Sequence, residues 1–66
     1  MNVKPNLKLK MLLLQKGMTQ RQLAFGANID EGRISKIIKG YEVPTSEMKE
    51  EIAEFLGVPE GECFQL

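Results

Sequence analysis

The 66-residue sequence contains no histidine and no tryptophan, and Cys63 is its only cysteine. One thiol excludes an intramolecular disulfide, and without histidine the chain has too few ligands for a zinc site or a cysteine–histidine nucleophile pair. The longest apolar run has four residues, 11–14, whereas a membrane span needs about 18 and the core of a signal peptide about 7–15. These absences predict a small soluble cytoplasmic protein without catalytic residues, metal or cofactor.

The rest of the composition is that of a globular protein. Apolar residues make up 42% of the chain and charged residues 27%, as in folded rather than disordered domains. A chain this short buries only about 60% of the surface that its unfolded form exposes, so its core is small. We therefore expect one domain over residues 1–66, without a cavity for a small-molecule ligand.

Charge is distributed unevenly along the chain, although its sum is zero. Residues 1–40 hold eight basic residues against two acidic ones, and residues 41–66 hold one basic residue against seven glutamates. The resulting net charges of +6 and −6 suggest a polyanionic partner for the first part. Small helical proteins also carry such charge blocks by chance, so the pattern alone leaves nucleic acid and simple solvation equally open.

Glycine, proline and capping residues divide the chain into short helices. Side-chain oxygens that can cap a helix N-terminus are available at Thr19, Asp30 and Thr45. No segment alternates apolar and polar residues for long enough to predict a strand. The fold class is therefore all-α, a compact bundle of four to five helices. The predicted helices span residues 6–16, 20–27, 31–39 and 46–56, followed by a short last turn that starts at residues 58–59.

The segment of residues 19–40 carries the functional signal. A three-residue turn, 28–30, separates its two helices, and this length is typical of helices joined at a steep angle. Small Ala24 allows the two helices to approach closely. The segment, TQRQLAFGANIDEGRISKIIKG, resembles the helix-turn-helix of the Cro/repressor (XRE) family. Flanking residues 16–20, 44–45 and 52–58 also resemble that family, so the resemblance covers about residues 7–64 and implies a lambda-repressor-like DNA-binding fold.

The resemblance also implies which residues contact DNA. Helix 31–39 would lie in the major groove, while the first helix of the motif would cross the phosphate backbone. A lysine can donate to guanine and a glutamate can accept from cytosine. By position in the family motif, the residues expected to read bases are Glu31, Gly32, Arg33 and Lys36. Those expected to contact phosphate are Gln20, Arg21, Lys39, Gly40 (through its backbone N–H) and Tyr41.

Several residues depart from the family pattern. Glu31 places a carboxylate near phosphates: it reads cytosine, holds Arg33 or Lys36 in place, or weakens DNA binding, and we favour cytosine. Gly32 lacks a side chain at a reading position and allows close approach of the backbone to the bases. Ser35 is as compatible with solvent as with a DNA contact.

Three further departures concern packing. The positions of Leu13 and Ile38 often hold an arginine–glutamate pair in the family; both are apolar here, so we expect the two side chains to touch. Gly26 interrupts the second helix. Phe25 replaces a usually polar residue, either as a partner contact or as a ring folded along its own helix.

The first helix has more apolar residues than one face can use. Leu9, Leu12 and Leu13 form one face suited to the core, whereas a second stripe recurs at intervals of four and three residues. Either the chain's last turn, with Phe64 and Leu66, covers this stripe, or the stripe is a homodimer interface. The second stripe comprises Leu7, Met11 and Leu14.

Two functions therefore remain in competition. The favoured one is a sequence-specific regulator of double-stranded DNA, a repressor that binds an inverted repeat as a homodimer formed before or on the DNA. Such a protein would be cytoplasmic, bacterial or phage-encoded and associated with the nucleoid. The rival is a protein-interaction module or antitoxin-like protein on the same fold. No membrane partner is expected.

Overall fold

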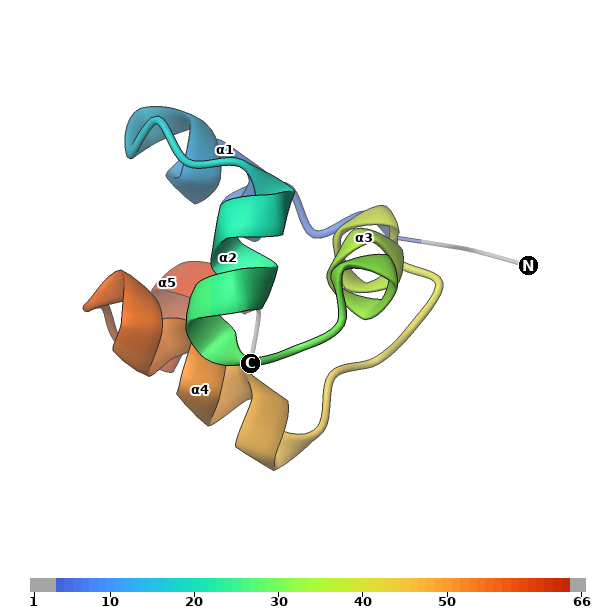
Figure 1. Cartoon of the computed structure of the whole chain (residues 1–66). Helices are drawn as coiled ribbons and strands as arrows, with labels where there is room; N and C mark the ends of the chain where they lie inside the picture. Colours follow the sequence, from blue (N-terminus) through green and yellow to red (C-terminus); the bar gives the residue numbers. More distant parts are fainter. Residues whose placement is uncertain (1–3, 65–66) are drawn as a thin grey trace.

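The computed structural model describes residues 4–64, which form five helices and no strand (Figure 1). The order of elements agrees with the prediction, and the bounds of the second and third helices agree to the residue. The first helix is one residue shorter at each end than predicted, because Asn6 is its cap rather than its first residue. The helices are α1 (Leu7–Gln15), α2 (Gln20–Ala27), α3 (Glu31–Lys39), α4 (Ser46–Leu56) and α5 (Glu60–Cys63).

Side-chain caps fix where four of the helices begin. The Asn6 amide oxygen accepts from the backbone N–H of Leu9 at 3.0 Å and starts α1. Thr45 Oγ1 accepts from the N–H of Met48 at 3.1 Å and starts α4. Thr19 and Asp30 do the same for α2 and α3, so all three capping residues expected from the sequence are confirmed as caps.

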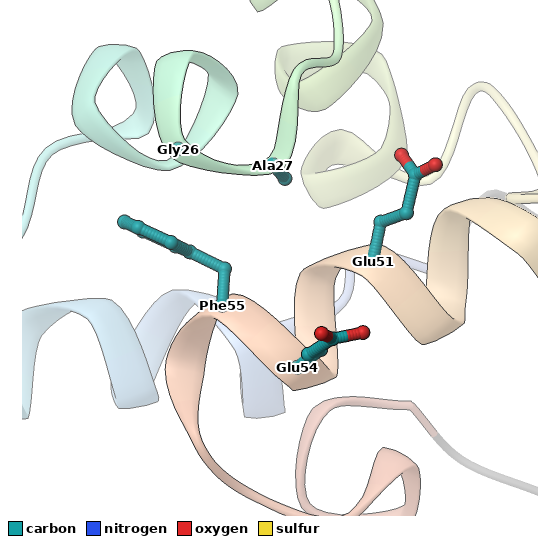
Figure 2. Close-up of a pocket in the computed structure, with 5 residues that line it drawn as sticks. All are labelled: Gly26, Ala27, Glu51, Glu54 and Phe55. Atoms are coloured by element: carbon teal, nitrogen blue, oxygen red, sulfur yellow. The ribbon is translucent and has the colours of Figure 1, made fainter.

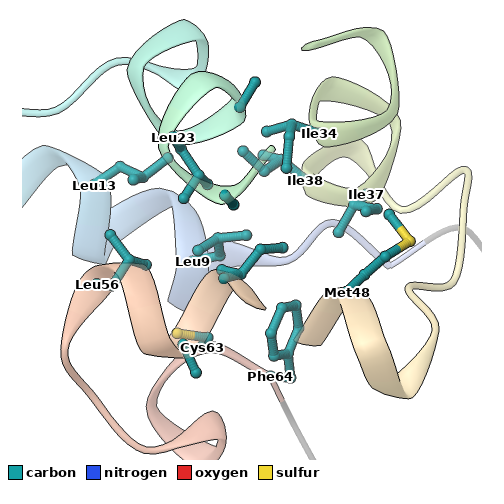
Figure 3. Packing of buried hydrophobic residues seen from close by; sticks show 14 residues of the cluster. Leu9, Leu13, Leu23, Ile34, Ile37, Ile38, Met48, Leu56, Cys63 and Phe64 are labelled. Atoms are coloured by element: carbon teal, nitrogen blue, oxygen red, sulfur yellow. The ribbon is translucent and has the colours of Figure 1, made fainter. Parts of the chain in front are cut away.

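The core lies where all five helices meet (Figure 3). Leu9, Leu23, Ile34, Ile52 and Cys63 have no exposed surface, and each comes from a different helix. Phe64, which follows α5, closes the core from the side of α4 and α5 (Figure 3). Because one small cluster joins every helix, the positions of α2 and α3 depend on the whole chain.

α1 buries one face and exposes the other. Leu9 and Leu13 are buried and Leu12 is partly buried against the core, as predicted. Leu7, Met11 and Leu14 are 61%, 57% and 70% exposed. Phe64 therefore leaves this second stripe largely uncovered; Leu66, the other predicted cover, lies outside the described residues.

Leu13 and Ile38 both belong to the buried cluster (Figure 3), which agrees with the replacement of a polar pair by apolar residues. The same region of α3 is tied to the chain before α1, because the Asn6 N–H donates to the Ile38 carbonyl at 2.7 Å. Direct contact between the two side chains stays a prediction. No helix within residues 4–64 is long and apolar enough to span a membrane.

Candidate nucleic-acid interface

A capping box fixes the start of α2. The Gln22 N–H donates to Thr19 Oγ1 at 3.0 Å, and the Thr19 N–H donates to Gln22 Oε1 at 2.8 Å. Two N–H groups that the helix leaves free are therefore satisfied by side chains. Gln20 and Arg21, the residues predicted to contact phosphate from this helix, are the first two residues of α2, half-buried and exposed respectively.

The backbone of Asn28 and the side chain of Asp30 shape the turn between α2 and α3. Asn28 has left-handed backbone angles (φ 58°, ψ 44°), which asparagine tolerates better than most residues. Its N–H and that of Ile29 donate back to the last turn of α2, the latter to the Ala24 carbonyl at 2.9 Å. Asp30 Oδ2 then accepts from the Arg33 N–H at 3.3 Å and starts α3. The predicted three-residue turn is confirmed, and it fixes the direction in which α3 leaves α2 (Figure 1).

α3 has two distinct faces. Ile34, Ile37 and Ile38 are buried in the core, while Ser35 is half-buried. All four residues predicted to read bases lie on the exposed part of this helix: Glu31, Gly32, Arg33 and Lys36. The predicted base-reading residues are therefore all accessible to solvent, and Lys39 is exposed at the end of the helix.

The end of α3 changes one predicted contact. Gly40 has φ 88°, a left-handed conformation that favours glycine. Its N–H, predicted to bind phosphate, donates instead to the Ile37 carbonyl at 3.2 Å. This donor is not free, because the helix needs it to end. Lys39 and Tyr41, both exposed, flank it with side chains that remain accessible, Tyr41 to 70%.

Arg33 has an ionic partner that the sequence did not reveal. Its Nε donates to Glu42 Oε2 at 2.8 Å, and its Nη2 lies 2.7 Å from the same oxygen. One of the three roles considered for Glu31 was to hold Arg33 in place. In the structure Glu42 holds Arg33 instead. Arg33 and Glu42 are nine positions apart, a spacing that does not bring two side chains together on one helix. The only indication of the pair in the sequence is a glutamate in the short loop after a basic helix.

Gly32 lies close to the cap of α3. A Cβ at this position would lie 2.9 Å from Asp30 Oδ2, the oxygen that holds the helix start. Glycine at position 32 therefore leaves room for the capping oxygen of Asp30, a role that the sequence did not reveal.

Gly26 packs against the ring of Phe55 on α4. A Cβ on Gly26 would lie within 2.1–2.6 Å of three atoms of that ring, so the glycine lets α2 approach α4. These two residues, with Ala27, Glu51 and Glu54, line a pocket between the helices (Figure 2). Phe55 shares the helical spacing of the buried residues Met48, Ile52 and Leu56 on α4, yet its side chain is 43% exposed. Two carboxylates and no basic residue line this pocket, so it does not suit a phosphate.

Phe25 points away from the core. Its side chain is 89% exposed, so the ring is not sheltered by its own helix, which was one of the two expectations. It lines a shallow surface region at the start of α3, together with Arg21 and Glu31.

Residues 4–64 offer little support for metal binding or for a reactive thiol. No group of three histidine, cysteine or acidic side chains is placed there to hold a metal ion. Burial, then the charges of Glu62 and Glu60, raises the pKa of the Cys63 thiol, while Lys16 acts in the opposite direction. A protonated, buried thiol is unreactive, so Cys63 serves as a small apolar residue of the core.

Comparison with known proteins identifies the family. The model of the family described as HTH_3, helix-turn-helix, matches residues 9–63. No curated protein and no solved structure matches the chain. The matched region covers most of the chain, including the capped turn and the exposed face of α3. The family consists of DNA-binding regulator domains rather than enzymes. The chain therefore belongs to the XRE-type helix-turn-helix family, and its kind of function is regulation of transcription through binding to double-stranded DNA.

Proposed function

We propose that the protein is a transcriptional repressor that occupies an inverted-repeat operator as a homodimer and blocks access to the promoter. The observation that carries this proposal is the exposed face of α3, because its direction is fixed by the caps at both ends of the turn. A helix whose direction is already fixed can enter the major groove without a separate ordering step. The entropic cost of binding is therefore lower.

Within this proposal the contact residues of α2, α3 and the loop after α3 divide into base readers and phosphate binders. Lys36 and Arg33 donate to guanine, and Glu31 accepts from cytosine N4. Gly32 allows the backbone to approach the base edges. Lys39, Arg21, Gln20 and Tyr41 bind phosphates and set the register of the helix in the groove. The Gly40 N–H already has a partner in α3. Gly40 therefore contributes by ending the helix between Lys39 and Tyr41.

The dimer would form through the second stripe of α1, residues Leu7, Met11 and Leu14. Their exposure of 57–70% supports this role, because neighbouring apolar side chains on a helix gain by leaving water. Two half-sites would then lie about 34 Å apart, one helical turn of DNA. Met11→Lys should shift sedimentation toward the monomer without unfolding the protein. A wild-type protein that is monomeric both free and on its operator would exclude a dimer.

A protein-interaction module is the second candidate, because the exposure of Phe25 is unusual for an aromatic residue. An aromatic side chain at 89% exposure suits the centre of a protein interface better than solvent. Seven glutamates after residue 40 would favour a basic partner.

Selection from a random duplex library near 100 mM salt separates the two functions. A repressor should enrich an inverted repeat, and Lys36→Ala should lose a guanine preference that Lys39→Ala retains, because only the first contacts a base. Glu31→Gln should lose a cytosine preference. A folded wild-type protein that enriches no sequence would contradict operator binding and favour the protein-interaction module.

A further inference from the structure

The pair between Arg33 and Glu42 uses one particular edge of the guanidinium group. Nε and Nη2 both approach Glu42 Oε2, at 2.8 and 2.7 Å. These two nitrogens form the side edge of the planar group, and a guanidinium has five N–H donors in a fixed arrangement. Three donors remain, and two of them, one on Nη1 and one on Nη2, point along the outer end of the side chain. That end edge has the geometry for guanine O6 and N7.

The backbone holds Glu42 beside α3. The N–H groups of Tyr41 and Glu42 donate to the Lys36 carbonyl at 2.8 and 3.3 Å, so the loop that carries the carboxylate begins bound to the recognition helix. The Glu42 side chain is 24% exposed and that of Arg33 is 51% exposed. The carboxylate is thus the more sheltered member of the pair, while the arginine remains accessible.

We propose that Glu42 is a specificity-determining positioning residue, which orients Arg33 so that the end edge of its guanidinium group recognises a guanine. The proposal rests on the proposed function, since it assigns a base contact to Arg33. An unpaired arginine on a helix surface samples many rotamers and can bind any nearby phosphate. An arginine held at its side edge is ordered before binding, and its charge is partly neutralised, so it favours base recognition over non-specific phosphate binding.

The experiment is sequence selection on duplex DNA with four proteins: wild type, Arg33→Ala, Glu42→Ala and Glu50→Ala. Glu50 is an exposed residue of α4 without an ion pair in residues 4–64, so its variant controls for the loss of one negative charge. Arg33→Ala should lower the preference for guanine at one operator position by about five- to a hundredfold. Glu42→Ala should weaken the same preference by about two- to tenfold, the cost of ordering one long side chain. Glu50→Ala should leave it unchanged.

A second variant tests the orientation directly. Arg33→Lys keeps the charge but has no planar group with two edges. A lysine can still donate to guanine, but it has no second edge for Glu42 to hold, so this variant should weaken the guanine preference, and adding Glu42→Ala to it should cause no further loss. Thermal unfolding of each variant distinguishes this effect from damage to the fold, because an exposed ion pair contributes little to stability.

The outcomes separate this proposal from the proposed function. An enriched operator whose guanine preference is unchanged or stronger in Glu42→Ala would overturn the positioning role without contradicting the proposed repressor function. An operator unaffected at every position by Arg33→Ala would do the same. A wild-type protein that enriches no operator would overturn both.

Discussion

Cys63 is the residue whose titration the structure constrains most directly. Its side chain has no solvent exposure, and burial together with Glu62 and Glu60 raises its pKa above the ordinary value of 9.0. The folded protein therefore keeps this thiol protonated at a pH where the unfolded chain has lost the proton. Its stabilising effect is complete below pH 9 and declines as the pH rises above it.

We expect the free energy of unfolding to fall between neutral pH and pH 10.5, and to fall less in Cys63→Ala, which has no thiol to titrate. Urea denaturation of both proteins across this range measures the difference. Other groups titrate in the same range, but they are common to both proteins. Parallel pH profiles would contradict a raised pKa for the thiol.

Gly26 and Phe55 form the contact that explains a glycine within a helix. Replacing glycine by alanine in an exposed helix normally stabilises it by about 1 kcal/mol. Here the new methyl group would have to displace the Phe55 ring, and the ring would lose apolar contact with α2.

Gly26→Ala should therefore fail to stabilise the wild-type protein, yet should stabilise a Phe55→Ala variant by about 1 kcal/mol. A double-mutant cycle of urea denaturation curves measures this change. If the alanine has the same effect in both backgrounds, the two residues are not coupled and the close approach of α2 and α4 is wrong.

The two faces of α1 provide a matched comparison at adjacent positions. Leu13 is 4% exposed and Leu14 is 70% exposed. Leu13→Arg would bury an unpaired charge and should destabilise the protein by more than about 2 kcal/mol. Leu14→Arg should change the stability of the dilute monomer by less than about 0.5 kcal/mol. Circular dichroism melts at low protein concentration test both variants, and a fully stable Leu13→Arg would refute the predicted contact with Ile38.

The helices themselves could be predicted because their signals are local. Thr19, Asp30 and Thr45 have capping oxygens at the positions where helices begin, and a capping residue acts within three positions of itself. Phe55 and Glu42 were not predictable in the same way. The place of Phe55 depends on a gap beside Gly26, and the partner of Glu42 depends on how a loop returns beside α3; both are set by the packing of distant segments.

The candidate site was predictable to the extent that helical geometry determines it. The exposed positions of α3 follow from the spacing of Ile34, Ile37 and Ile38, which fixes the opposite face. The backbone donor of Gly40, predicted to bind phosphate, has a partner within α3, which the resemblance to the family did not reveal.

At the scale of the whole molecule, the division of charge determines how binding responds to salt. The chain has no net charge, so long-range attraction to DNA must come from the basic first part of the chain. If a bound subunit neutralises about six phosphates, the logarithm of the affinity should fall with the logarithm of the salt concentration with a slope near −5.

This slope can be measured by fluorescence anisotropy on a fixed duplex between about 50 and 200 mM salt. Lys39→Ala should reduce it by about one unit, since that residue is proposed to contact phosphate. A slope near zero for the wild-type protein would indicate that ionic contacts to DNA contribute little to binding, as a protein-interaction module would allow.

The separation of the two faces of α3 also bears on how such a protein can diversify. The residues that hold α3 in the bundle, Ile34, Ile37 and Ile38, are buried, whereas those proposed to recognise bases are all exposed. The turn before the helix is fixed by Asn28 and Asp30, neither of which is among the proposed base readers. Among the proposed readers only Gly32 lies against the cap of α3. Operator preference can therefore be exchanged by substituting Glu31, Arg33 and Lys36 alone, so a duplicated copy of this chain could acquire a new set of target promoters without first passing through an unstable intermediate.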